Sequence, residues 1–166
     1  MEKLLFGTSG DWVLTMARIV LGIVPFAHGA QKLLGWYGGA GFTKAVQMFA
    51  GHLKLPAAVA DLVIFTEFLG GLGLIIGLFS RLAALEILAT MVGAVITVHY
   101  RHGLFMNWAG EKKGHGFEYH LLTIALALVI IVRGAGAFSL DHAFYEHQLG
   151  DSTAVTQIGS NDYESH

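Results

Sequence analysis

Several ionisable and hydrogen-bonding residues lie within the long apolar runs of this chain or at the ends of those runs. The candidate ligand-binding set is His28, Gln31, Lys32, Trp36, Glu67, His99, Asn107, Trp108, Glu118 and Tyr119. Histidine and carboxylate groups that converge at the mouth of a membrane bundle indicate a quinone site, a proton relay or a metal site. A belt of interfacial residues that contact lipid headgroups and water is the alternative interpretation.

Metal chemistry has little support in the spacing of these residues. The chain has no cysteine, and its histidines and carboxylates do not follow the spacing of di-iron helix bundles. Haem would need two histidines at matched depth, and His28 with His99 is the only such pair that the spacing offers. We therefore expect no metal site and no haem, leave the cofactor unassigned, and regard a quinone as one candidate.

Composition indicates the elements that must position these groups. Only 13% of the 166 residues are Asp, Glu, Lys or Arg, about half the usual ~25% of a soluble domain. The mean hydropathy is +0.59, which predicts an integral membrane protein in contact with the lipid bilayer. The net charge of −2 gives no sign of nucleic-acid binding.

Four apolar runs approach or reach the roughly 20 residues that a transmembrane helix needs. They predict an all-α, four-helix integral membrane bundle with helices over Trp12–His28, Ala57–Phe79, Leu82–Tyr100 and Glu118–Val132. A cleaved signal peptide is the alternative interpretation of the first run. Lys3 is the only basic residue before that run and Arg18 interrupts it, which disfavours this alternative.

The connections differ in character. A long glycine-rich loop follows the first run and contains an amphipathic stretch, Thr43–Leu53, that could lie in the membrane interface. The residues Asp141–Leu149 predict a short surface helix, and residues 150–166 predict a disordered tail. We therefore expect a transmembrane domain over residues 1–140 and a polar, acidic tail over residues 141–166.

Four spans would place both termini on one side of the membrane. Basic residues on the loop side are Lys32, Lys44, Lys54, Arg101, Lys112 and Lys113, and those on the terminal side are Lys3, Arg81 and Arg133. This bias favours cytoplasmic loops and external termini.

Antiparallel threading also predicts which charged groups share a depth. Arg18 in the first run and Glu86 in the third lie at matching depths, so we expect a structural ion pair between them. Each begins a stripe of small and polar residues at helical spacing, which predicts that the two stripes face one another. Glu67, near the middle of the second run, is expected at the bottom of a vestibule on the loop side.

Three ordered motifs resemble those of the DoxX family of membrane proteins. They are HGAQKL at 28–33 followed by GWYGG at 35–39, NW at 107–108 followed by GHGFEYHLL at 114–122, and GAGAFSLD at 134–141. The resemblance covers about residues 12–142. It implies a four-helix protein of the bacterial inner membrane, similar to the membrane subunit of thiosulfate:quinone oxidoreductase, and it places the family's motif positions on His28, Gln31, Lys32, Gly35, Asn107, Glu118 and Tyr119.

The preferred functional interpretation is a membrane subunit of a redox complex that binds a quinone or a similar small apolar ligand at the loop-side mouth. Lys32, His28 or His99 would bind a quinone carbonyl, and Glu67 or Glu118 would carry protons. A non-catalytic accessory or scaffold subunit is the alternative, and a small transporter is a weaker one. The sequence leaves open whether the chain is itself an enzyme. Its expected partners are other subunits of a complex and, if it oligomerises, a second copy.

Overall fold

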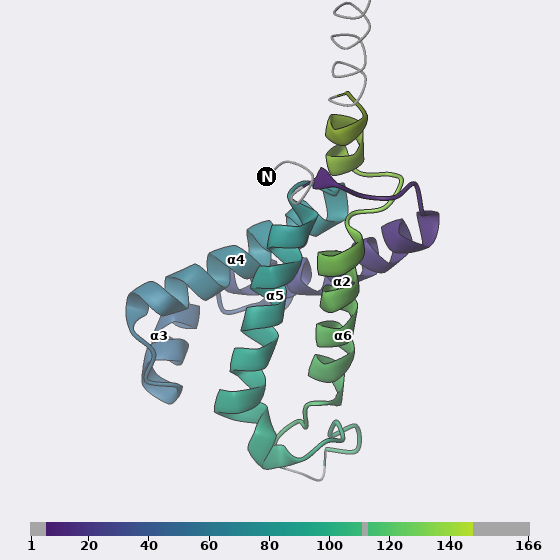
Figure 1. Cartoon of the computed structure of the whole chain (residues 1–166). Coiled ribbons are helices and arrows are strands. Elements are labelled where there is room, and N and C mark those ends of the chain that lie inside the picture. The colour runs from purple at the N-terminus through teal and green to yellow at the C-terminus, as the bar shows by residue number, and fades with distance from the viewer. Residues whose placement is uncertain (1–5, 111–112, 148–166) are drawn as a thin grey trace, which may run out of the picture.

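The structure is a computed structural model that describes residues 6–110 and 113–147. Within these ranges the chain is helical and contains no strand, which confirms the all-α class. The long helices are α2 (Trp12–Leu33), α3 (Phe42–His52), α4 (Ala57–Ile76), α5 (Ser80–Ala94) and α6 (Glu118–Arg133) (Figure 1). A 3₁₀ turn, η1 (Trp36–Gly38), lies between α2 and α3. A π-helical turn, η2 (Val95–His99), and a 3₁₀ turn, η3 (Tyr100–His102), continue α5.

Three helical segments are long and apolar enough to cross a membrane, namely Trp12–Leu33, Ala57–Ile76 and Ser80–His102. Helix α6 has 16 residues and is therefore about 24 Å long, somewhat shorter than a ~30 Å hydrocarbon core. The fourth span thus stays a prediction. Helix α2 continues five residues beyond the expected end at His28, and the amphipathic stretch forms α3. Residues 140–147 are helical at the start of the expected surface helix, and residues 148–166 lie outside the described ranges.

The long helices associate as two pairs. Helix α2 packs along α4 and α5 packs along α6, while α4 also contacts α5 near their shared turn. Helices α4 and α5 diverge from that turn, and the α5–α6 pair runs across the α2–α4 pair (Figure 1). The ends of the helices therefore spread apart more than an aligned bundle would allow.

Glycines make the contact between α2 and α4 close. A Cβ at Gly29 would lie 2.6 Å from the Cα of Phe68, and a Cβ at Gly71 would lie 2.7 Å from the Cα of Phe26. The rings of these two phenylalanines stack beside the contact, with centroids 5.1 Å apart. The stripe that begins at Arg18 does face another helix, as expected, but that helix is α4 and not α5.

Arg18 is fully buried and donates hydrogen bonds to backbone carbonyls of two segments. Its Nε lies 2.8 Å from the carbonyl oxygen of Ala135, and its Nη2 lies 2.6 Å from that of Phe138. Its Nη1 donates to the carbonyls of Leu74 and, at 2.9 Å, of Ile75. The last carbonyls of α4 have no partner within the helix, so the guanidinium supplies one.

The expected ion pair between Arg18 and Glu86 is not among the ion pairs of the described residues. Arg18 instead lies within electrostatic range of Asp141, in the segment that follows α6. The depth argument failed here because it assumed that the axes of all four helices are aligned. In the structure the helix pairs cross, and Arg18 lies beside the last turn of α4.

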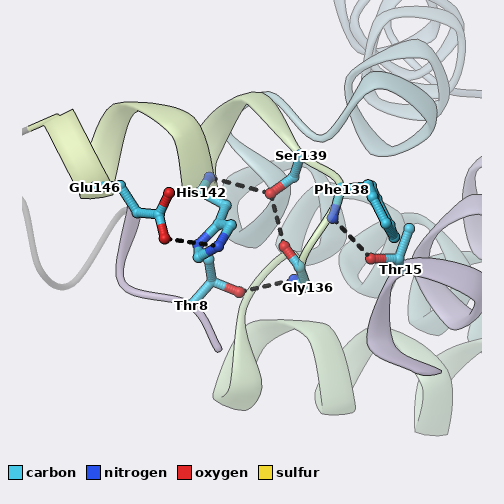
Figure 2. Close-up of polar contacts among 7 residues, drawn as sticks. All are labelled: Thr8, Thr15, Gly136, Phe138, Ser139, His142 and Glu146. Carbon is cyan, nitrogen blue, oxygen red and sulfur yellow. Dashed lines mark hydrogen bonds and ion pairs between the residues drawn. The ribbon is translucent and has the colours of Figure 1, made fainter. Parts of the chain in front are cut away.

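Asp141 is also buried, and it caps the N-terminus of α5. Its carboxylate oxygens accept hydrogen bonds from the backbone N–H groups of Phe79 and Ser80, both at 2.8 Å. The preceding residues are tied to the start of the chain, since Thr8 accepts from the N–H of Gly136 and Thr15 accepts from that of Phe138 (Figure 2). The expected domain boundary between residues 140 and 141 therefore falls within a packed segment.

We predict that Asp141→Ala lowers the free energy of unfolding by about 1–3 kcal/mol, because two buried backbone donors lose their acceptor. Thermal unfolding of the detergent-solubilised protein, followed by tryptophan fluorescence, measures the effect. Glu146→Ala is the matched control, since within the described residues that exposed carboxylate pairs with His142 alone and its loss should have little effect. Equal melting temperatures for the two variants would contradict this role of Asp141.

We also predict that α6 crosses the membrane, which single cysteines can test in this cysteine-free chain. Ala109→Cys, in the loop before α6, and Ala143→Cys, after α6, would then react from opposite sides. In spheroplasts a membrane-impermeant maleimide should label only the cysteine at position 143, as external termini require. Labelling of both positions from one side would mean that α6 does not span.

Candidate functional site

Lys32 and Glu67 form an ion pair between α2 and α4. Lys32 lies in the last turn of α2, and Gly29, one turn earlier, brings that helix against the backbone of Glu67 and Phe68. The Glu67 side chain is 7% exposed and that of Lys32 is 23% exposed. The sequence identified both residues, and the structure brings them together.

Two aromatic groups complete the surroundings of this pair. The ammonium of Lys32 lies over the ring of Phe49 from α3, 5.6 Å from its centroid, which is a cation–π geometry. The carboxylate of Glu67 acts electrostatically on the hydroxyl of Tyr119 in α6. The pair is thus enclosed by α3 and lies within the electrostatic range of α6.

A cavity of about 420 Å³ lies at the start of α6, under the loop that precedes it. Trp108, Glu118 and Tyr119 line it together with leucine and methionine side chains. The indole Nε1 of Trp108 donates a hydrogen bond to Oε1 of Glu118 at 3.3 Å. Three of the predicted site residues therefore share one apolar cavity.

His99 and His120 form a separate cluster beside this cavity. Their ring centroids are 4.2 Å apart, and Nδ1 of His99 donates to the carbonyl of His115 at 2.8 Å. Within the described part of the chain, Nδ1 of His120 is buried without a hydrogen-bond partner. His99 belongs to the π-helical turn, a feature often found at functional sites. The sequence favoured Glu118 over His120 as a site residue, because two residues that are two positions apart do not share a helix face.

The other predicted site residues lie apart from these groups. His28 is exposed, and Trp36 is 50% exposed with its ring edge-on to Tyr37. The carbonyl of Gln31 accepts from the N–H of Gly41 and so fixes the turn after α2. The carbonyl of Asn107 accepts from the N–H of Gly110 in the loop before α6. These four residues do not line the cavity, and their ligand-binding role stays a prediction.

Among residues 6–110 and 113–147, no three His, Asp or Glu side chains lie close enough together to hold a metal ion. The lining residues of the cavity that carry a polar group are instead Trp108, Glu118 and Tyr119. Such a lining can bind an uncharged ligand that has hydrogen-bonding groups.

We predict that Lys32→Met lowers the free energy of unfolding by about 3–5 kcal/mol, because it leaves the Glu67 carboxylate buried and unpaired. The double variant Lys32→Met/Glu67→Leu should regain most of that loss, since neither charge remains to be desolvated. Melting temperatures in detergent provide the comparison, with Lys44→Met on the exposed face of α3 as the control. A double variant no more stable than Lys32→Met would contradict this account of the pair.

Three known bacterial proteins are similar to this chain in sequence. The chain is 30% identical over 115 residues to a Bacillus subtilis (strain 168) protein named "Putative oxidoreductase CatD", covering 69% of this chain and 75% of that one. It is 28% identical over 126 residues to the inner membrane protein YqjF of Escherichia coli (strain K12), covering 76% and 87%. An uncharacterised protein of Haemophilus influenzae is 30% identical over 141 residues, covering 81% and 92%.

No solved structure matches the chain significantly. The family model named DoxX matches residues 13–100, which include α2, α3, α4, α5 and most of the turns that follow α5. The chain therefore belongs to the DoxX family of membrane proteins.

Proposed function

We propose that this protein is the quinone-binding membrane subunit of a redox complex in the bacterial inner membrane. The observation that carries the proposal is the cavity of about 420 Å³ at the start of α6, which contains Trp108, Glu118 and Tyr119 in an otherwise apolar lining. Its volume lies within the roughly 300–1,000 Å³ of small-molecule sites, which are commonly apolar with a few placed polar groups. A quinone headgroup has that character, because two carbonyl acceptors are attached to an apolar ring.

The polar groups of the cavity suit the two ends of such a headgroup. The phenol of Tyr119 and a protonated Glu118 are donors for quinone carbonyls, and Trp108 offers an aromatic face for ring stacking. Reduction of a quinone to a quinol takes up two electrons and two protons. Glu118 would deliver protons to the bound ring, and Glu67 would be a second proton-carrying group near Tyr119.

The electrons would come from a partner subunit. The chain has no cysteine, so it cannot supply a dithiol or a cysteine-ligated cluster of its own. The printed name of the Bacillus subtilis relative refers to an oxidoreductase, and that of the Escherichia coli relative refers to the inner membrane. These names support a redox role and a location in the inner membrane. In this proposal α6 would be the fourth span.

We predict that quinone binding saturates and that it quenches the fluorescence of Trp108 but not that of Trp12. The variant Trp12→Phe/Trp36→Phe retains only Trp108, and Trp36→Phe/Trp108→Phe retains only Trp12, which is 66% exposed near the start of α2. In lipid nanodiscs, decylubiquinone should quench Trp108 with a saturable curve, because a bound quinone stacks close to it. Trp12 should show only the linear quenching caused by quinone dissolved in the lipid.

The carboxyl supplies the specificity control. Glu118→Leu in the Trp108-only background should weaken the apparent quinone affinity about tenfold, equivalent to about 1.4 kcal/mol, because leucine has no hydrogen-bond donor. Asp61→Asn, which changes a carboxylate outside the cavity, should leave that affinity unchanged. Linear quenching of both tryptophans would reject the quinone site and favour an accessory or scaffold role.

A further inference from the structure

A second cavity, of about 450 Å³, lies between α4 and α5 where these helices diverge. Leu53 and Leu55, from the connection between α3 and α4, contribute to its lining. Most of the remaining lining is apolar, and the polar exceptions are Thr66, Glu86, Thr90 and Thr97. Glu86 and Thr90 of α5, and Thr97 of the turn that continues it, belong to the stripe of small and polar residues that begins at Glu86. The sequence predicted that this stripe faces another helix. In the structure this stripe faces a cavity.

Glu86 is the only ionisable side chain in this lining. It is the seventh residue of the Ser80–His102 span, so it lies about 9 Å along the helix axis from Ser80. Gly70 of α4 leaves room for it, since a Cβ at that position would lie 3.2 Å from Oε2 of Glu86. The carboxyl is therefore accommodated inside a membrane span.

The charges inside the spans differ in how they are satisfied. Arg18 has four backbone carbonyls, and Lys32 has Glu67. Among the described residues, Glu86 has neither an ion-pair partner nor a hydrogen-bond donor. A charge within a bilayer costs about 2.5–3.5 kcal/mol on insertion scales, so such groups are generally paired or functional. The missing partner of Glu86 is then either a proton or a ligand that enters the cavity.

The hydroxyl groups around Glu86 indicate which ligand chemistry fits. The hydroxyl of Thr66 donates to the carbonyl of Val63 at 3.1 Å, and that of Thr97 donates to the carbonyl of Gly93 at 2.8 Å. Both hydroxyl protons are thus already used, and each oxygen offers a ligand only acceptor lone pairs. A carboxylate is likewise an acceptor only. Glu86 as a carboxylate, Thr66 and Thr97 therefore favour a ligand that donates hydrogen bonds. The hydroxyl of Thr90, which has no hydrogen-bond partner among the described residues, can either donate or accept.

We propose that this cavity binds a lipid-soluble amine in its protonated form, with Glu86 as its counter-ion. An ammonium group has donors and no acceptor, which matches this lining, while an apolar body would contact the leucine and valine side chains. On binding, the Glu86 carboxylic acid releases its proton to water and the resulting carboxylate pairs with the ammonium. This proposal does not depend on the quinone site, because the two cavities share no lining residue.

The neighbouring ionisable groups leave Glu86 as the only titratable counter-ion. On α5 with its continuing turns, on the elements packed against it and on the α3–α4 connection that lines the cavity, they are Lys54, Asp61, Glu67, Arg81, His99, Tyr100, Arg101, His102, Glu118, Tyr119, His120, Arg133 and Asp141. None of them lines the cavity. Arg81 donates to the carbonyls of Ile131 and Gly7, and Glu67 is paired with Lys32.

A protection experiment on the unaltered chain tests the proposal. Dicyclohexylcarbodiimide adds covalently to protonated carboxyl groups in apolar surroundings, and the site of addition can be mapped by mass spectrometry. In phosphatidylcholine nanodiscs, which carry no anionic lipid, we expect the reagent to modify Glu86. The amine 4-phenylbutylamine should slow this reaction at least tenfold, whereas the uncharged 4-phenylbutanol should change it less than twofold.

Variants give an independent measure of the same binding. Glu86→Gln should weaken equilibrium binding of 4-phenylbutylamine at least tenfold, and Asp61→Asn should leave it within twofold. A circular dichroism spectrum like that of the unaltered chain verifies that each variant is folded, and this control does not depend on the quinone site. Equal protection by the amine and the alcohol, protection by neither, or unchanged amine binding in Glu86→Gln would overturn the proposal.

Discussion

The buried guanidinium of Arg18 is the contact on which the arrangement of the helices depends. A charge removed from water is tolerated only when its hydrogen-bonding groups are satisfied, and here backbone carbonyls satisfy them. Two of these carbonyls end α4, and the other two belong to the segment after α6. One side chain of α2 therefore holds both the end of α4 and the segment that follows α6.

The turn between α4 and α5 is fixed from the same side. Gly77 has a φ of +75°, and a Cβ there would lie 2.9 Å from Nη1 of Arg18, so only glycine fits. Asp141 holds Phe79 and Ser80 through its carboxylate. Because the turn is anchored, α4 and α5 diverge from a defined point. The space between them, far from the anchor, is the cavity that contains Glu86.

Hydropathy identified the helices of this chain because an apolar run of about 20 residues has few other stable forms. The glycine stripe of α2 was equally visible, since Gly22 and Gly29 recur at helical spacing. The partner of that stripe was not visible, because the depth argument assumed aligned helices and the two helix pairs cross. The sequence could not predict the hydrogen-bond partners of Arg18, because they are backbone carbonyls, which every residue has.

The sequence predicted several residues of the candidate site, but it did not predict which of them lie together. Lys32 and Glu67 were both identified, but their pairing follows from the extension of α2 beyond His28, which Gly29 obscured because glycine is a poor helix former. Trp108, Glu118 and Tyr119 are close in the sequence and share a cavity for that reason. His28 and Trp36 lie apart from them because the helix pairs spread at this end of the molecule.

The π-helical turn Val95–His99 has a consequence for the evolution of this family. Such a turn holds one residue more than an α-helical turn, and it rotates everything that follows relative to everything before it. Deletion of one residue between positions 95 and 98 would leave a span one residue shorter than its present 23, still long enough to cross a bilayer. Glu86 would keep its place on α5, while the part of the cavity lining after the deletion would rotate and His99 would turn away from His120. The number of residues in this turn, rather than the identity of any side chain, thus decides whether α5 and its continuing turns contribute both Glu86 to its cavity and His99 to the pair with His120.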